Sequence, residues 1–435
     1  MDSLIQNSAF KVQYGRVPDV SKLFPEIGAV VINDLDGFIY QATRYGWGRG
    51  YDANENKVNL FFDFDGVQQL AFRLKLPSTG SVTIDWGDGT PEVVPGQDDT
   101  MITPTSTYST PGQYYVSISG DVETFTWFWI FNLTEVIPVY GDLTIVEKMV
   151  NMELFNVTRT YVTGDITGFT NLLSVSNYGL VDAPNLYGDL AGITASLSIA
   201  ITNNQKLTMN AVQDWSALGN LRLADCRLDG ASMDRVIRSI KNGTDTLCNL
   251  EGNDLPSEAV RADFFTALNN GVQMNFSAKL PWVNNGPDLY AGLNALRQGP
   301  NEADAVAPFV ATGLGSPNVF ESQPGIKGSK FRFHMNANPA PSSGWNIQAP
   351  IPTVLDDLTE ISLAVKHSGV GEFVVIRLWG LNNMGIFITK TMTDWRNWFI
   401  YAKARATDTT LYLGESSSTN DGEVFVDNLT VKTVS

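Results

Sequence analysis

The most informative segment for the fold is Leu218-Gly-Asn-Leu221-Arg-Leu223-Ala-Asp-Cys226-Arg-Leu228. Its apolar anchors follow the spacing L-x-x-L-x-L-x-x-C-x-L, and a second copy follows as Cys248-x-Leu250-x-x-Asn253-x-Leu255. Upstream, Val139-Tyr-Gly-Asp-Leu143 recurs as Val162-Thr-Gly-Asp-Ile166 and as Leu186-Tyr-Gly-Asp-Leu190. Recurrence at a nearly fixed interval is typical of stacked repeats, each of which buries its apolar face against its neighbours.

Each Gly-Asp copy precedes an alternating segment that ends near an asparagine, at residues 152–156, 173–177 and 197–203. Later, Ser232–Ile240 and Ser257–Leu268 have a capping serine and helical spacing. Asn-Gly pairs at 242–243 and 270–271 end these helices. Residues 138–280 therefore predict a solenoid with strands on its concave side and helices on the convex side of its later turns.

This region resembles leucine-rich repeats of the Gly-Asp-Leu type. The resemblance implies that Cys226 and Cys248 occupy inward anchor positions and are buried structural residues. It also places Arg222, Asp225 and Arg227 at variable positions of the concave strand face. Such faces bind proteins or glycans, although a solvated polar face is the simpler reading.

Residues 57–137 alternate with period two, as in Leu70–Leu76 and Val82–Trp86, which predicts antiparallel strands of a sandwich. The run Ile84-Asp-Trp-Gly-Asp-Gly-Thr90, with the later Pro111-Gly112 and Tyr114-x-Val116-x-Ile118, resembles the polycystic-kidney-disease-type (PKD) immunoglobulin-like domain. Trp86 is expected between the sheets. Asp85 and Asp88 are explained by the turn rather than by catalysis.

Residues 281–287 are expected to form a linker, and residues 288–435 alternate like the strands of a two-sheet jelly roll. The opening Asn294-x-Leu296-x-x-Gly299-x-x-Glu302 and the closing Val426-Asp427-Asn428 resemble galactose-binding-like jelly rolls of carbohydrate-binding modules. That resemblance implies structural calcium held by Glu302, Asp427 and main-chain carbonyls, since calcium takes several oxygen ligands. Because sugars stack on aromatic rings, the candidate glycan contacts are Trp345, Trp379, Trp398 and Tyr412, each of which has a core alternative.

The composition excludes several classes of protein. With 29 Lys and Arg against 46 Asp and Glu, the net charge of −17 opposes nucleic-acid binding. Two His and two Cys are too few for a three-His or four-Cys zinc site, and a Ser-His-Asp triad would need His334 or His367, neither of which has a convincing nucleophile partner. No apolar run reaches membrane-spanning length, and the start of the chain does not read as a signal peptide.

The sequence thus predicts a mainly β, multi-domain protein: an Ig-like sandwich, a short leucine-rich-repeat solenoid with some helix, and a C-terminal jelly roll. Residues 1–56 are expected to dock on another partner, with a hairpin at Asp36-Gly37 and a stretch at 45–51 too glycine-rich for a regular strand. The pairing of a PKD-like domain with Gly-Asp-Leu repeats resembles modular surface and virion proteins of bacteria and their phages.

That resemblance leads us to expect a non-enzymatic structural protein of a bacteriophage virion: a fibre, head decoration or tail appendage assembled in the host cytoplasm. The N-terminal region would contact other virion proteins, and the binding modules would contact host-surface glycan or protein. Multiple copies or a homo-oligomer would multiply weak affinities. The alternatives are a bacterial cell-surface or exported adhesin, an accessory carbohydrate-binding protein, or an enzyme that cleaves a host polysaccharide.

Overall fold

The computed structural model confirms a mainly β protein. The chain divides into two compact units, residues 1–236 and 237–435, with the boundary inside helix α1 (Gly230–Ile240). The described residues are 30–32, 38–43, 46–52, 57–64, 66, 68–98, 100–131, 139–142, 149, 151–157, 161–167, 174–178, 186–194, 197–202, 204, 207–288, 310–312, 319–324, 329–335, 346–352, 355–369, 373–379, 384–389, 396–404, 408–415 and 422–435.

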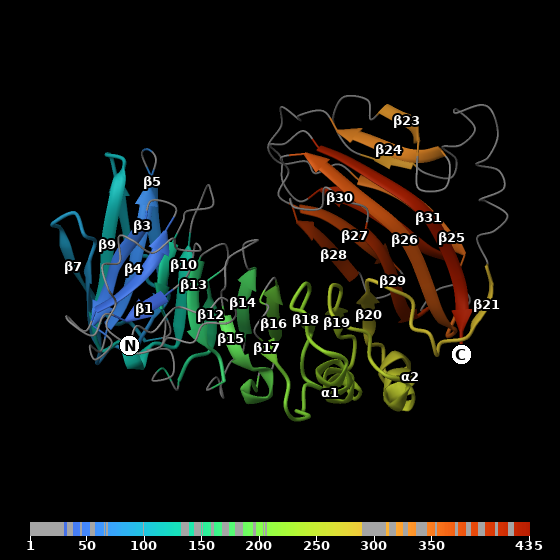
Figure 1. The fold of residues 1–435 in the computed structure, drawn as a ribbon, viewed down its shortest axis with the longest axis horizontal. Coiled ribbons are helices and arrows are strands. Elements are labelled where there is room, and N and C mark those ends of the chain that lie inside the picture. The colour runs from blue at the N-terminus through green and yellow to red at the C-terminus, as the bar shows by residue number, and fades with distance from the viewer. Residues whose placement is uncertain are drawn as a thin grey trace, which may run out of the picture. The chain divides into compact units, whose positions relative to one another are not determined.

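The first unit is built from short strands (Figure 1). They are β1 (Val30–Ile32), β2 (Phe38–Thr43), β3 (Gly46–Asp52), β4 (Lys57–Phe64), β5 (Gln68–Lys75), β6 (Ser81–Asp85), β7 (Pro91–Pro95), β8 (Thr105–Tyr108), β9 (Gly112–Gly120), β10 (Trp127–Phe131), β11 (Val139–Asp142), β12 (Leu154–Asn156), β13 (Tyr161–Asp165), β14 (Ser174–Tyr178), β15 (Leu186–Asp189), β16 (Ser198–Thr202), β17 (Leu207–Thr208) and β18 (Asn220–Arg222). Short 3-10 turns occur at Val122–Thr124 and Leu190–Gly192.

Two long sheets run through this unit. One has the order β17-β15-β13-β11-β4-β9-β6-β7, and the other includes β18-β16-β14-β12-β10-β5-β8. In both, antiparallel strands of residues 57–131 pass directly into parallel strands: β4 pairs with β11, and β10 pairs with β12. Because both sheets continue, the backbone of the sandwich is hydrogen-bonded to that of the stacked strands in each sheet.

The sandwich core and its turn follow the sequence. Trp86 is 2% exposed and its ring lies 5.5 Å from that of Phe72, while the buried Tyr108 hydroxyl donates to the Trp86 carbonyl at 2.8 Å. Gly87 and Gly89 have φ values of +73° and +87°, which favour glycine. Asp85 accepts from the Gly87 N–H, and Asp88 from the backbone and hydroxyl of Thr90, so both carboxylates hold the turn.

The three strands of residues 30–52 form a separate antiparallel sheet in the order β1-β2-β3. The expectation that residues 45–51 are too glycine-rich for a strand was wrong, because Gly46–Asp52 is β3 and pairs with β2. Backbone pairing needs no side chain, so glycines are tolerated where a neighbouring strand supplies the register. The turn expected at Asp36-Gly37 lies outside the described residues.

The stacked strands are in register from turn to turn. Phe155 lies opposite Val175, which lies opposite Ile199, which lies opposite Leu221, and all four side chains are buried. The Gly-Asp copies form the other sheet, in β11, β13 and β15. Each early repeat therefore contributes a strand to each of the two sheets, whereas the sequence predicted strands on the concave side.

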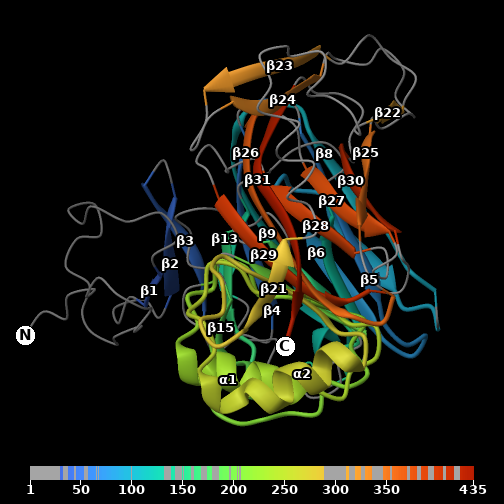
Figure 2. The same ribbon diagram turned by 90° about the vertical axis from the view of Figure 1, so that its right-hand side faces the viewer.

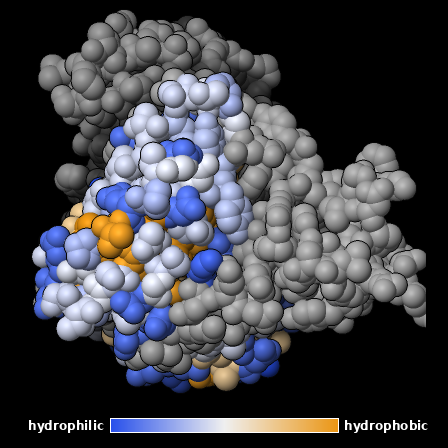
Figure 3. Space-filling view, turned by 90° about the vertical axis from the view of Figure 1, so that its left-hand side faces the viewer, coloured by the Kyte–Doolittle hydropathy of each residue, from blue (hydrophilic) through white to orange (hydrophobic). Residues whose placement is uncertain are grey.

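Strand β7 ends its sheet. Prolines at both of its ends cannot donate to an added strand, which protects an exposed edge from pairing with another chain. Val93 on β7 is 68% exposed. Figure 3 shows hydrophobic side chains scattered among hydrophilic ones on this side of the first unit.

The second unit holds the end of α1, the helix α2 and strands of two sheets. Its elements are β19 (Leu247–Asn249), a 3-10 turn (Glu258–Val260), α2 (Arg261–Asn269), β20 (Gln273–Phe276), β21 (Asn285–Asp288), β22 (Val310–Thr312), β23 (Val319–Pro324), β24 (Ser329–Met335), β25 (Asn346–Pro352), β26 (Leu358–Gly369), β27 (Phe373–Trp379), β28 (Met384–Thr389), β29 (Arg396–Lys403), β30 (Asp408–Glu415) and β31 (Gly422–Val434). One sheet includes β23-β24-β31-β26-β29-β20-β19, and the other is β22-β25-β30-β27-β28. Figure 2 shows the two sheets as separate layers.

The stacked strands of this unit end on β29. Strand β20 pairs with it antiparallel, so Met274 faces Tyr401 and Phe276 faces Phe399. The buried Tyr401 ring lies 5.4 Å from Phe264 of α2, and the Leu280 N–H donates to the Tyr401 hydroxyl at 3.1 Å. Burial and the nearby Glu360 charge raise the pKa of this hydroxyl, which therefore stays protonated.

The segment 281–287 is packed, in contrast to the predicted linker. Trp282 and Val283 are 8% and 2% exposed, and Trp282 donates from Nε1 to the Pro256 carbonyl at 3.2 Å. Asn285 begins β21, which pairs with β31, and its amide donates to Glu360 at 2.7 Å. A buried tryptophan and two side-chain hydrogen bonds therefore hold this segment in place.

A polar side chain caps α1 and the 3-10 turn that leads into α2, whose own N-cap, Val260, has no side-chain cap. Asp229 caps α1 by accepting from the Ser232 N–H at 2.7 Å, in place of the predicted cap Ser232, whose hydroxyl accepts from Met209. Ser257 accepts from the Ala259 N–H ahead of α2. Cys226 and Cys248 are fully buried free thiols, as predicted, and burial raises the pKa of Cys226 to about 12. Among the described residues, neither helix is long and apolar enough to cross a bilayer.

Candidate binding faces

One sheet face of the first unit carries two straight rows of side chains, which we call the two-row face. The rows cross β5, β10, β12, β14, β16 and β18 at matching register positions. The first row is Lys75, Trp127, Leu154, Ser174, Ser198 and Asn220, and the second is Arg73, Trp129, Asn156, Ser176, Ala200 and Arg222.

The opposite side of the same strands is the core. The intervening residues are apolar and buried: Phe72, Leu74, Phe128, Ile130, Phe155, Val175, Ile199 and Leu221. Since side chains alternate along a strand, the two rows face away from this core. Their described side chains are half-buried, except that of Ala200, which is buried. The two-row face is thus an accessible surface with a rigid apolar backing.

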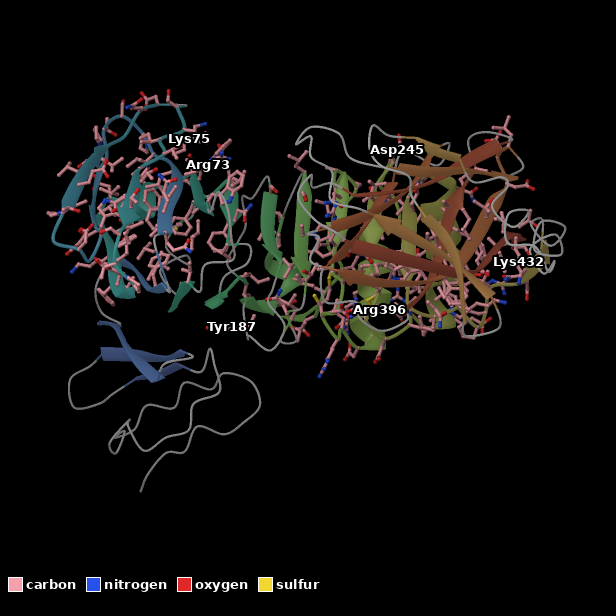
Figure 4. All side chains as sticks on the ribbon, turned by 90° about the horizontal axis from the view of Figure 1, so that it is seen from above. Arg73, Lys75, Tyr187, Asp245, Arg396 and Lys432 are labelled. Atoms are coloured by element: carbon pink, nitrogen blue, oxygen red, sulfur yellow. The ribbon has the colours of Figure 1, made fainter. Side chains whose placement is uncertain are left out.

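Aromatic rings and cations meet at the β5–β10 end of the two-row face. The Arg73 guanidinium lies 4.5 Å from the centre of the Trp129 ring, and the Lys75 ammonium lies 5.5 Å from that of Trp127. Figure 4 shows Arg73 and Lys75 as neighbours on β5. The Trp127 Nε1–H donates to Glu153 at 3.2 Å. Cation–π contacts of this length hold both cations beside the rings.

Polar groups continue the two-row face to β18. The Asn220 amide donates to the Ser198 hydroxyl at 3.2 Å and accepts from Arg222 Nε at 3.3 Å. Five steps between neighbouring strands, at about 4.8 Å each, make the face roughly 24 Å wide from β5 to β18. This is wide enough for an extended ligand rather than a single small group.

The structure separates the three residues that sequence analysis assigned to the strand face. Arg222 ends β18 and belongs to the two-row face. Asp225 and Arg227 do not, because both lie in the loop after β18 with φ values of +55° and +53°. The strand is shorter than the repeat spacing suggested, so the variable positions beyond Arg222 fall on a turn.

A second candidate is one face of the five-stranded sheet β22-β25-β30-β27-β28. Register places Tyr412 opposite both Gln348 and Arg377, and Trp379 opposite Thr410. We call these five positions the mixed face. The other face of the same strands is mostly apolar, and its polar exceptions are Thr409 and Glu415 on β30. Its apolar register positions are Ile347, Ala349, Leu411, Leu413, Val374, Ile376, Leu378, Ile386 and Ile388.

Trp379 and Tyr412, predicted separately, therefore share one face as diagonal neighbours on adjacent strands. Diagonal positions of this kind lie about 7–8 Å apart. Trp398 is a correction: it lies on β29, opposite Leu363, and is fully buried, so it serves the core and offers no ring to a sugar. Trp345 lies outside the described residues.

Sequence analysis missed Trp127 and Trp129, along with Arg73 and Lys75. The available signal was the alternation Trp-Phe-Trp-Ile beside Phe-Arg-Leu-Lys, which places both tryptophans and both cations on the polar side of neighbouring strands. Arg377 and Gln348 had no signal until the strand register was known.

The metal and triad candidates are placed only in part. Glu302 lies outside the described residues, and Asp427 is described by its backbone on β31, opposite Ala364. Among the described side chains, no three His, Cys, Asp or Glu residues gather as a metal site. His334 lies on β24 and His367 on β26, and both are described by their backbone.

Comparisons with known proteins give partial likenesses. No family model and no curated protein matches the sequence. The family 11 carbohydrate-binding module of a cellulosomal cellulase of Clostridium thermocellum has a TM-score of 0.23 and 12% identity, covering 31% of this chain and 93% of that module. The module TmCBM61, in complex with beta-1,4-galactotriose, has a TM-score of 0.23 and 11% identity, covering 29% and 89%. The enzymatically active domain of tailspike protein 4 of bacteriophage CBA120 has a TM-score of 0.25 and 10% identity, covering 65% and 45%.

Proposed function

We propose that this chain is a non-enzymatic, adhesive structural protein of a bacteriophage virion that presents binding faces to host-surface glycan. The observation that carries the proposal is the division of the five-stranded sheet into one mostly apolar face and the mixed face with Trp379, Arg377 and Tyr412. An apolar face packs inward, so the mixed face is left for solvent and ligand. Aromatic rings take the C–H face of a sugar, while Arg377 and Gln348 pair with its hydroxyls.

The mixed face is tested by a glycan array with the purified chain and a W379A/Y412A variant. We expect binding to at least one bacterial surface glycan and its loss in the variant, because both rings are removed. Leu355→Ala is the matched control, since it also deletes a large exposed side chain from the second unit, at 50% exposure. Absence of glycan binding by the unmodified chain, or equal loss in both variants, would refute the mixed face as the site.

The virion assignment is tested separately by mass spectrometry of purified particles, in which the chain should be present in multiple copies. Its absence from particles, with retained glycan binding, would favour the alternative of a bacterial surface or exported adhesin. Release of reducing sugar from a host polysaccharide by the purified chain would contradict the non-enzymatic part of the proposal.

Structural calcium belongs to the same proposal, with Glu302 and Asp427 as ligands. Calcium at about 100 times its Kd would add about 2.7 kcal/mol to the free energy of unfolding. The melting temperature should therefore fall with a chelator and recover with calcium. Glu302→Gln should abolish the difference. An equal melting temperature with and without calcium would exclude the site.

A further inference from the structure

We propose that the two-row face binds an acidic saccharide chain, in addition to the glycan contacts proposed for the mixed face. The first argument is charge. The chain has 29 basic and 46 acidic residues, yet the positions of the two rows include Arg73, Lys75 and Arg222 and no Asp or Glu, and Glu153 beside them accepts from Trp127. The sign on this face is opposite to that of the whole chain. It therefore favours a ligand that carries negative charge.

The second argument is the geometry of the rings. Trp127 and Trp129 are two residues apart on β10, so their attachment points are separated by about 6.8 Å along the strand. Their buried neighbours Phe128 and Ile130 fix the strand to the core, which keeps the two rings in place before a ligand arrives. Successive sugar rings can lie against such a pair, with their C–H faces on the indoles.

The third argument is that each ring has its own cation. Arg73 stands beside Trp129 and Lys75 beside Trp127. A guanidinium held on a ring face keeps N–H donors at its edge for a carboxylate. A sugar that stacks on an indole and carries a carboxylate would thus meet both partners at once, which a neutral sugar would not.

Nucleic acid is the competing polyanion, because indoles and cations also bind unpaired bases. A net charge of −17 opposes it more strongly than it opposes a saccharide. A single DNA strand carries one negative charge per about 3.4 Å of helix axis, whereas a uronate polymer carries at most one per sugar ring. Arg73 and Lys75 are two residues apart on β5, so their attachment points lie within the screening distance of about 8 Å, while Arg222 lies across the face on β18. Such widely spaced cations suit the sparser charge.

The test uses the full chain with polygalacturonate, alginate and hyaluronate in affinity electrophoresis at low ionic strength. Fully methyl-esterified pectin is the neutral counterpart of polygalacturonate, and oligothymidylate is the nucleic-acid probe. We expect at least one acidic polymer to bind, more weakly as salt is added, and to change the tryptophan fluorescence. R73Q/K75Q should lose about tenfold or more in affinity, the effect of one hydrogen bond to a charged group.

The matched control R227Q/K279Q removes two exposed cations of the chain outside the two-row face and should keep its affinity. W127A/W129A should lose both binding and the fluorescence change, while circular dichroism of R73Q/K75Q confirms folding. The proposal is overturned if none of the three acidic polymers binds, if the control loses as much, or if the esterified pectin or oligothymidylate binds as tightly. It is also overturned if variants on this face change the oligomeric state without affecting saccharide, since a second copy would then be the occupant. W379A/Y412A should leave this binding intact, so the two sites fail independently.

Discussion

Stacked parallel strands join other strands in both units, but the junction in the first unit differs from the junction in the second. At the beginning, both sandwich sheets continue, through β4 to β11 and through β10 to β12. At the end, one strand pair, β20 with β29, continues the sheet, and the side without a sheet is closed by α2 and the rings of Phe264, Trp282 and Tyr401. Backbone pairing thus secures the first junction, and aromatic burial secures the second.

The largest test of this difference is Phe264→Ala. Phe264 is fully buried and contacts Trp282 at 5.1 Å and Tyr401 at 5.4 Å. Its truncation should lower the free energy of unfolding by about 3–5 kcal/mol, from lost burial and the cavity left behind. Chemical denaturation measures the loss, and thiol labelling locates it, because Cys248 lies in the second unit and Cys226 in the first.

Labelling of Cys248 should accelerate more than that of Cys226 in this variant, since both thiols are buried in the folded chain. Phe265→Ala is the control: this neighbouring ring is only half-buried, so its loss should cost less than half as much. Equal acceleration at both cysteines would show that the aromatic cluster stabilises the whole chain and would break the comparison.

A smaller effect is expected at the ion pair of Arg396 on β29 with Glu251. The two lie 3.6 Å apart, and the side chains are 35% and 5% exposed. Removing the cation strands a mostly buried carboxylate, but water screens the exposed partner, so Arg396→Ala should cost about 1–3 kcal/mol. A double-mutant cycle with Glu251→Gln measures the coupling. A coupling of zero would mean that aromatic packing alone closes this end.

Much of the fold could be predicted from the sequence, because it depends on local pattern. Alternation fixed β5, β6 and β9, and helix spacing with polar caps gave α1 and α2 within a few residues. The junctions could not be predicted this way. Whether Phe276 faces Phe399, or whether residues 281–287 pack, depends on pairing between segments more than 100 residues apart, which leaves no periodic trace.

The same distinction between local pattern and long-range pairing separates the site residues that were predicted from those that were missed. Arg222 was found because a repeat frame states which positions face outward. Trp398 was misassigned as a glycan contact because alternation gives two faces without saying which is buried. Trp127 and Trp129 were missed because their value comes from Arg73 and Lys75 on another strand. The sequence gives the residue types, but only the register of paired strands shows which of them are neighbours.

The smallest expected effect comes from Asp88, a turn carboxylate of the sandwich, and contrasts with the ion pair at the other junction. Burial disfavours the Asp88 charge, but hydrogen bonds from the Thr90 hydroxyl and N–H outweigh this and lower the pKa of Asp88 from its usual 3.8. A lowered native pKa gives stability above the unfolded-state value that is lost as pH falls through the native one. Because Asp88 is exposed, its lowered pKa is worth at most about 0.5 kcal/mol of stability.

Asp88→Asn should therefore remove a small loss of stability of the first unit that occurs below about pH 4. Labelling of Cys226 measures this loss, and the pH profile of Cys248 labelling should stay unchanged. An equal change at both cysteines would mean that the two junctions respond to acid as one.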